Sequence, residues 1–199
     1  MDHRQFFDQA AANWDALIEE QILPRLQAIV AGLDIEPGAR VLDVGCGTGV
    51  LFPLLLEALN GTGRIVALDI SGGMLRRAQA KGYPVECMQS DAQSLPLRDQ
   101  TFDWVICNAV FPHFPHKLRA LAEIRRVLKD GGRLVICHTA SREVINELHR
   151  SIGGVVAHDT IPPDDEMRRL LWEARLDRAV VQDEPDHYLV LAHRNDGFA

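Results

Sequence analysis

Three glycines within five residues follow a short apolar run near the start of the chain. The run is residues 41–44, and the glycines are Gly45, Gly47 and Gly49. Glycines at the end of a strand let the backbone turn sharply and let a ligand touch the main chain where a Cβ atom would clash. In open α/β sheets, ligands bind beyond the carboxyl ends of the strands. The spacing therefore predicts a ligand-binding loop between a strand and a helix.

Two carboxylates follow the next two apolar runs. Asp69 comes directly after residues 64–68, and Asp91 follows residues 85–88. The first can accept hydrogen bonds from both hydroxyls of a ribose, and the second from an adenine amino group, because charge strengthens such bonds. A nicotinamide dinucleotide site also combines a glycine loop with an acid. Its pattern Gly-x-Gly-x-x-Gly breaks here, because Val50 stands where the third glycine belongs.

The eight histidines are the candidates for acid–base chemistry. His113 follows the fourth apolar run and His138 ends the fifth, so we expect both side chains on the substrate side of the pocket. A neutral imidazole there can accept a proton from an attacking nucleophile, or it can only shape the pocket. No two histidines have the spacing HxH or HxxxH, so we expect no metal site. A metal held by three histidines that meet in the fold stays the lesser alternative.

Short apolar runs that alternate with segments of helical period must position these residues. The alternation predicts parallel strands joined by crossover helices, covered on both faces because the runs are apolar almost throughout. The five strands are expected at residues 40–44, 64–68, 85–88, 102–107 and 133–137. A terminal hairpin formed by two further runs, at 179–181 and 188–192, is expected to close one edge of the sheet.

The remaining segments connect this sheet. A helix is predicted from about Asp15 to Ala31, with a kink at Pro24. The last helix is predicted to begin at Pro163, because proline suits a first helical turn. Residues 151–157 are predicted to form a loop that either gates the pocket or only connects two elements.

Length and charge restrict the class of protein. The 199 residues indicate one domain, and the net charge of −7 argues against a protein that binds nucleic acid through its phosphates. The sequence contains no apolar run long enough for a membrane span and no signal-peptide stretch at its start. We therefore expect a cytoplasmic protein, a monomer or a homodimer, whose four cysteines are reduced thiols.

The order of these motifs resembles a known family. A glycine loop, then Asp69, then Asp91, then the sequence FDWVICN at 102–108 is similar to the class I S-adenosylmethionine-dependent methyltransferases. Within them the chain is most similar to the small-molecule branch that includes the ubiquinone and menaquinone biosynthesis methyltransferases. FDQAAANWD at residues 7–15 resembles the entry segment FDxxAxxWD, and LKDGGRL at 128–134 resembles LKPGGRL.

The resemblance implies a fold. The chain is expected to form a single methyltransferase domain over residues 1–199, with residues 1–35 as an N-terminal helical lid. The fold is expected to be α/β, with a Rossmann-like doubly wound sheet of seven strands and helices on both faces. The implied strand order is 3-2-1-4-5-7-6, with strand 7 antiparallel.

The resemblance also implies a site for S-adenosylmethionine. The residues expected to bind this cofactor are Asp43, Gly45, Cys46, Gly47, Gly49, Asp69, Ile70, Asp91, Ala92, Asn108 and Ala109. His113 and His138 are the candidate catalytic residues. The implied reaction is in-line transfer of a methyl group to a small-molecule acceptor that the sequence does not identify. Two alternatives stay open, a cofactor-binding regulatory protein without turnover and an NAD-dependent dehydrogenase.

Overall fold

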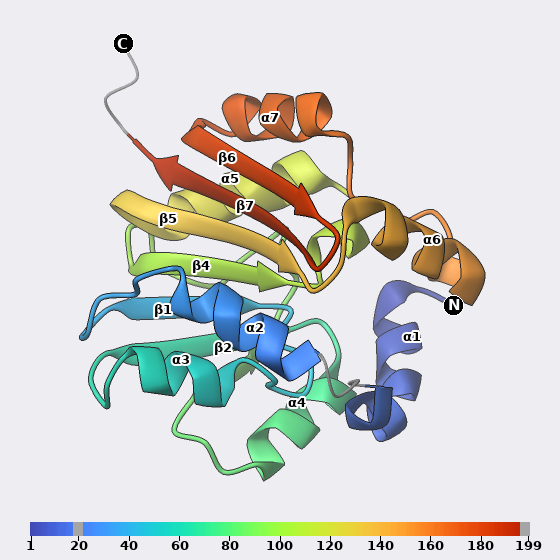
Figure 1. Ribbon diagram of the computed structural model, residues 1–199. Helices are drawn as coiled ribbons and strands as arrows, with labels where there is room; N and C mark the ends of the chain where they lie inside the picture. The colour runs from blue at the N-terminus through green and yellow to red at the C-terminus, as the bar shows by residue number, and fades with distance from the viewer. Residues whose placement is uncertain (18–21, 196–199) are drawn as a thin grey trace.

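The seven strands of the protein form one mixed sheet (Figure 1). A computed structural model describes residues 1–17 and 22–195. The strands are β1 Arg40–Val44, β2 Arg64–Asp69, β3 Glu86–Gln89, β4 Phe102–Asn108, β5 Leu128–His138, β6 Leu176–Glu184 and β7 His187–Arg194. Their order is β3-β2-β1-β4-β5-β7-β6. β1 to β5 pair in parallel, and β7 is antiparallel to both of its neighbours, which confirms the predicted topology.

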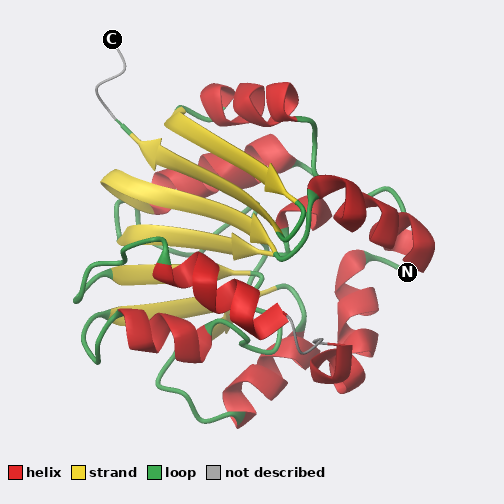
Figure 2. Cartoon of the chain, in the orientation of Figure 1, coloured by secondary structure: helices red, strands yellow, loops and turns green. Residues whose placement is uncertain are grey.

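Helices cover both faces of this sheet (Figure 2). The α-helices are α1 His3–Ala10, α2 Ile22–Ala31, α3 Phe52–Ala58, α4 Gly72–Ala80, α5 Lys117–Val127, α6 Arg142–Ile152 and α7 Asp164–Glu173. Three short 3-10 helices are η1 Ala11–Leu17, η2 Phe111–His113 and η3 Gly154–Val156. Apolar residues of α2 and α3 pack with Val41 of β1, whereas those of α5 and α7 pack with its neighbour Leu42. Successive residues of a strand face opposite layers, so one apolar run serves both.

Local sequence signals account for several helix starts. Asp2 and Gln5 form a capping box at α1, in which each side chain accepts a hydrogen bond from the other residue's backbone N–H. Ser71 and Ser141 cap α4 and α6 in the same way with their hydroxyl oxygens. Pro163 directly precedes α7, close to the predicted start of that helix.

The predicted N-terminal helix from Asp15 to Ala31 is wrong at its start. Residues up to Leu17 form the 3-10 helix η1, and α2 begins at Ile22. Residues 18–21 lie outside the described residues. Pro24 is the third described residue of α2. Because the residues directly before α2 lie outside the described part of the chain, the kink at Pro24 stays a prediction.

Two further boundaries differ from the predictions. β5 begins at Leu128 rather than at Arg133, and its register against β4 shifts between Phe102 and Trp104. The expected loop at 151–157 is largely helical, because α6 runs to Ile152 and η3 follows it with Val156 buried. Gly153, with φ +73°, ends α6 as its C-cap, and the 3-10 helix η3 follows directly.

The carboxyl ends of the parallel strands point toward α1 and α6 (Figure 1). The N-terminal segment crosses this end of the sheet, where α1 contacts α4 and η3. None of the helices in residues 1–17 and 22–195 is both long and apolar enough to cross a membrane.

Candidate active site

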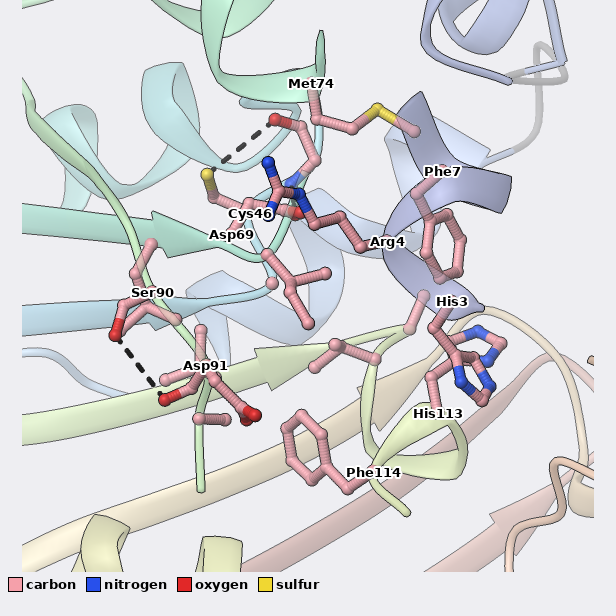
Figure 3. Close-up of a pocket in the computed structure, with 18 of the residues that line it drawn as sticks. His3, Arg4, Phe7, Cys46, Asp69, Met74, Ser90, Asp91, His113 and Phe114 are labelled. Carbon is pink, nitrogen blue, oxygen red and sulfur yellow. Dashed lines mark hydrogen bonds between the residues drawn. The ribbon is translucent and has the colours of Figure 1, made fainter. Parts of the chain in front are cut away.

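A cavity of about 370 Å³ lies at the carboxyl ends of the central strands, beneath α1 (Figure 3). This volume falls in the range of about 300–1,000 Å³ that is typical of small-ligand pockets. One end is lined by the glycine loop, Asp69 and Asp91. The other end is lined by His3 and His113, among others. The fold therefore joins two groups of residues, far apart in sequence, in one cavity.

The glycine loop turns sharply at the end of β1. The backbone N–H groups of Gly45 and Cys46 both donate to the Leu68 carbonyl oxygen of β2, at 2.7 and 3.0 Å. Gly45 has φ +70°, and a Cβ atom built on it would overlap the side chain of Val110. Gly45 is therefore required by both its backbone angle and its neighbour. Gly47, with φ +54°, lines the cavity, and a Cβ atom built on it would lie 3.7 Å from Nε1 of Trp14, an ordinary van der Waals contact.

Asp69 braces this loop from the end of β2. Its Oδ2 atom accepts a hydrogen bond from the Gly47 N–H at 2.9 Å, and its Oδ1 atom accepts one from Ser71 at 2.8 Å. The residue lines the cavity although it is only 7% exposed. Burial raises the pKa of Asp69, and the two backbone hydrogen bonds oppose that effect. Each oxygen keeps a lone pair for a ligand.

Asp43 does not line the cavity. It is 1% exposed, and its carboxylate accepts no hydrogen bond from the part of the chain that the structure describes. Burial and the nearby charge of Asp69 raise the pKa of Asp43 to about 8. Gly49 also lies outside the cavity lining, and a Cβ on it would lie 2.6 Å from Cε2 of Phe52. Gly49 thus serves the packing of the loop on α3.

Asp91 lies at the edge of the same cavity, in an open position. Asp91 is exposed, and its Oδ1 atom accepts hydrogen bonds from the backbone and side chain of Gln93, at 2.8 and 3.1 Å. Ile70 and Ala92 also line the cavity, as predicted from the sequence. The two carboxylates therefore differ in kind, because Asp69 is enclosed and braces the backbone while Asp91 is in contact with solvent.

Asn108 and Ala109 complete the wall where β4 ends. Both line the cavity. Ala109 has φ +53°, an uncommon angle for a residue with a Cβ atom, and its N–H donates to the Cys137 carbonyl oxygen at 2.9 Å. Backbone strain of this kind clusters at ligand sites.

The cysteine of the glycine loop is inert as a nucleophile. Cys46 lines the cavity, but its pKa is raised, chiefly by burial, so the thiol stays protonated. All four cysteines are free, as predicted.

His113 reaches the cavity from η2. Its Nδ1 atom lies 2.6 Å from Oδ2 of Asp159, and its ring meets the ring of Phe7 edge-on at 5.1 Å between centroids. Burial lowers the pKa of His113, and the hydrogen bond to Asp159 offsets only part of that effect. At neutral pH the ring is therefore uncharged. When Nδ1–H donates to Asp159, Nε2 is the nitrogen with a free lone pair.

The expectation that His138 projects into the pocket is wrong. His138 is 2% exposed and does not line the cavity. His138 is the last residue of β5, and it pairs with Tyr188 of the neighbouring antiparallel strand β7. Its Nε2 atom has no hydrogen-bond partner among the described residues, and burial lowers its pKa to about 3. A sequence cannot show this enclosure, because β7 comes 50 residues after His138.

The N-terminal segment covers the cavity and is held by polar contacts. Asp8 accepts hydrogen bonds from the Ser71 hydroxyl and the Gly73 N–H, at 2.7 and 2.8 Å. Asp15 accepts one from the hydroxyl of Thr48, which lies between Gly47 and Gly49 in the glycine loop. These contacts link α1 and η1 to the elements that form the cofactor end of the cavity.

Sequence reasoning missed three residues of the site. His3 and Arg4 line the cavity from α1, and Asp159 supports His113. The pair His158-Asp159 stood out in the sequence, but nothing marked which partner Asp159 would meet. His3 and Arg4 precede the FDxxAxxWD-like segment and carry no local signal.

Comparisons with known proteins agree with this geometry. Residues 42–136 match the methyltransferase domain family. A demethylmenaquinone methyltransferase of Symbiobacterium thermophilum is 37% identical over 151 residues, which cover 70% of this chain and 59% of that protein. Over this domain the chain is similar to the class I S-adenosylmethionine-dependent methyltransferases. The demethylmenaquinone enzyme is a relative from the small-molecule branch of that family.

Two more relatives of this chain extend the comparison. A malonyl-[acyl-carrier protein] O-methyltransferase of Geobacter sulfurreducens is 37% identical over 134 residues, 65% of this chain and 49% of that protein. A SAM-dependent methyltransferase of Thermotoga maritima has the same fold, with a TM-score of 0.78 at 21% identity over 96% of this chain and 99% of that one. The chain thus spans about half to three fifths of the length of these two curated relatives. Nothing in these comparisons supports a dehydrogenase or a protein without turnover.

The residues of the cavity fit S-adenosylmethionine, the family's cofactor. Asp69 offers carboxylate lone pairs suited to ribose hydroxyls, and Gly47 lines the cavity with backbone that carries no side chain. The chemistry of this end therefore suits the ribose of a nucleoside.

Proposed function

We propose that this protein transfers a methyl group from S-adenosylmethionine to a small-molecule acceptor. The observation that carries the proposal is the single cavity that joins the glycine loop and Asp69 to His113. Bound S-adenosylmethionine supplies a methyl group that an electron-rich atom attacks in line. The task of the chain is therefore to hold two reactants in one line.

Residues of the cofactor end would hold and orient the cofactor. Asp69 and the backbone of residues 45–47 would bind the ribose and the methionyl part, with Asp43 acting on the amino group from behind the loop. Ile70, Asp91 and Ala92 would contact the adenine, and Asn108 and Ala109 the region of the sulfonium. Positioning of this kind contributes on the order of 7–11 kcal/mol to catalysis when the reacting atoms are aligned.

Residues of the acceptor end shape a second subsite. Phe7 and Phe114 line it with aromatic carbon, and His113 adds a neutral imidazole. We infer that Nε2 of His113 accepts a proton from the acceptor if the acceptor enters protonated. Residues 1–17 would act as a lid that excludes water, supported by the contacts of Asp8 and Asp15. The expected lid of residues 1–35 is too long, because α2 packs in the core with β1 and α3.

Calorimetry tests the cofactor assignment. We expect S-adenosylhomocysteine to bind with micromolar affinity, about −8 kcal/mol, and NAD hardly at all. Gly45→Ala should abolish the binding because its Cβ atom would overlap Val110. Gly38→Ala is the matched control, since Gly38 also has a positive φ, +84°, but no atom within 4 Å of the added Cβ. Tight NAD binding without a response to S-adenosylhomocysteine would contradict the proposal.

A methyl-transfer screen tests the activity. The relatives are named for a demethylmenaquinone and for a malonyl group on a carrier protein, so the screen should begin with quinols and with carboxylic acids. Mass spectrometry should detect one added methyl group on an acceptor. Binding of the cofactor without any transfer across a broad screen would favour the regulatory alternative.

The setting of the protein is part of the proposal. The net charge of −7 supports a protein without nucleic-acid partners. We infer a cytoplasmic enzyme that works as a monomer or homodimer, with residues 1–199 acting as one domain. Light scattering after gel filtration measures the oligomeric state directly.

A further inference from the structure

Three side chains from distant segments meet at the acceptor end of the cavity. Figure 3 shows two of them, His3 and His113, side by side. Asp159, which follows η3, places its Oδ2 atom 2.8 Å from Nε2 of His3 and 2.6 Å from Nδ1 of His113. The ligand atoms of all three residues lie within 4.8 Å of one another. Two imidazole nitrogens and one carboxylate oxygen thus converge on one point.

The cluster is shielded and supported. The side chains of His3, His113 and Asp159 are 22%, 11% and 12% exposed. His149 donates its Nδ1–H to the backbone carbonyl oxygen of Asp159, at 2.7 Å, and its ring lies 4.8 Å from the ring of His113. A partner of this kind fixes the segment that carries the carboxylate. Supporting residues around metal ligands do the same.

We propose that His3, His113 and Asp159 bind a divalent first-row transition metal ion at the acceptor end of the cavity. Two imidazoles and a carboxylate are a ligand set that zinc, iron, manganese and cobalt accept. Three protein ligands leave a coordination position open, as catalytic metal sites require. Because His3 and His113 line the cavity, that position faces the space proposed for the acceptor.

The three side chains must move to hold an ion. Metal–ligand bonds of about 2.0–2.2 Å in a tetrahedron separate the ligand atoms by about 3.3 Å. The separations of 2.6 and 2.8 Å to Asp159 must therefore open by about half an ångström. The two histidine nitrogens, which lie up to 4.8 Å apart, must approach each other by up to about 1.5 Å, which rotation of the imidazole rings supplies. The ion would replace two hydrogen bonds on one oxygen with three coordinate bonds.

An ion at this place would have two consequences. It would join α1 to η2 and to the segment after η3, so it would latch the N-terminal lid on the acceptor end. It would also take Nδ1 of His113, which leaves Nε2 as an N–H donor and excludes this ring as a proton acceptor. The open position then binds the acceptor heteroatom and favours its deprotonated form. This role in the reaction, though not the binding of the ion, rests on the proposed methyl transfer.

Metal titration of the full chain tests the proposal. Protein without a polyhistidine tag is treated with a chelator, dialysed, and titrated with Zn²⁺ in a calorimeter. Co²⁺ in a parallel titration reports the coordination through its visible spectrum. We expect one ion per chain. His113→Gln and Asp159→Asn should each weaken Zn²⁺ binding at least about 100-fold, since even outer-sphere partners of metals contribute about 10–100-fold.

Two exposed histidines are the matched controls. His116 follows His113 by three residues, and His158 precedes Asp159. His116→Gln and His158→Gln should bind Zn²⁺ like the unchanged protein. Unchanged binding in His113→Gln and Asp159→Asn, or no binding in any form, would overturn the proposal. Binding that is lost in His3→Gln but kept in the other two would place the ion on the N-terminal segment alone, which also overturns it.

Two further measurements distinguish a loss of metal binding from misfolding and from a failure of the proposed function. Calorimetry with S-adenosylhomocysteine on each variant shows whether the fold and the cofactor end are intact, independently of any ion. Limited proteolysis near residues 1–10 should be at least about tenfold slower with Zn²⁺ in the unchanged protein and unaffected by Zn²⁺ in Asp159→Asn. Equal protection by Zn²⁺ in both would contradict the latch.

Discussion

The two ends of the cavity are built in different ways. At the cofactor end, Gly45, Gly47 and Asp69 lie at the ends of neighbouring parallel strands and act largely through the backbone. At the acceptor end, His113 and its partner Asp159 are 46 residues apart, and they act through side chains. A site made by strand ends is determined by the regular geometry of the sheet. A site made by converging side chains depends on how the whole chain packs.

The electrostatics of the two ends also differ. Burial, together with the nearby charge of Asp69, raises the pKa of Asp43 at the cofactor end to about 8, which leaves a buried acid there. Burial lowers the pKa of His113 at the acceptor end, which keeps its imidazole neutral. The acceptor end therefore offers a nitrogen that can accept a proton, whereas the cofactor end holds a carboxyl that tends to keep one.

The largest effect is expected at the acceptor end. His113→Ala should reduce the rate of methyl transfer about 10²–10⁴-fold, or about 2.7–5.5 kcal/mol in the barrier, whether the ring acts as a base or as a metal ligand. The affinity for S-adenosylhomocysteine should barely change, because His113 lies outside the cofactor end. Steady-state kinetics with an acceptor from the screen, together with calorimetry, measures both.

His116→Ala is the control for that variant, since His116 is exposed and three residues away. Full activity of His113→Ala would leave proximity and orientation as the whole mechanism. A loss of cofactor affinity in His113→Ala would break the separation of the two ends.

The next effect is expected at the cofactor end. Asp69→Ala should weaken S-adenosylhomocysteine binding by about 1.5–3 kcal/mol, roughly 10- to 150-fold, through the loss of charge-assisted hydrogen bonds. Because Asp69 also accepts from Gly47 and Ser71, we expect a lower melting temperature as well. Calorimetry and thermal unfolding measure the two losses. Unchanged affinity in a folded variant would show that the acid is misassigned.

A third effect concerns the buried histidine beside the acceptor end. His138 has a pKa of about 3 in the folded protein, against about 6.5 in an unfolded chain. Above pH 6.5 both states are neutral and the stability does not depend on this group. Below pH 6.5 the unfolded state binds a proton that the folded state does not, so stability falls by about 1.4 kcal/mol per pH unit until about pH 3.

His138→Phe should remove that dependence. Between pH 6.5 and pH 5 the free energy of unfolding of the unchanged protein should fall about 2 kcal/mol more than that of the variant. Urea unfolding of both proteins at several pH values measures this difference. The contributions of the other titrating groups cancel because both proteins contain them. Parallel curves for the two proteins would mean that His138 titrates normally and is not enclosed.

The smallest effect is expected at Asp91. Its carboxylate is exposed and already accepts from Gln93, so Asp91→Ala should weaken S-adenosylhomocysteine binding by less than about 1 kcal/mol. Calorimetry on Asp91→Ala and Asp69→Ala compares the loss of affinity at an exposed carboxylate with the loss at an enclosed carboxylate of the same pocket. An equal or larger loss at Asp91 would show that contact with the ligand, and not burial, decides the contribution.

Much of the cofactor end was predictable from the sequence. The glycine spacing predicted the loop, because only glycine adopts positive φ and close approach without cost, and Gly45 has both. Asp69 and Asp91 were predicted at one edge because parallel strands end on the same side of a sheet. The resemblance to methyltransferases supplied the strand order. Asp43, which lies in β1, and Gly49 of the loop fell outside the lining, because the sequence does not show which residues of a strand end or a loop face the cavity.

The acceptor end was decided by tertiary structure. His113 and His138 looked equivalent in the sequence, since each follows a parallel strand. Pairing of β5 with β7 buried His138 against Tyr188, while η2 carried His113 into the cavity. His3 came from the opposite end of the chain to meet Asp159. Backbone turns and strand ends are determined by a few adjacent residues, and the sequence by itself determined them. Convergence of side chains requires every intervening element to be packed, so only the folded chain decided which of them meet.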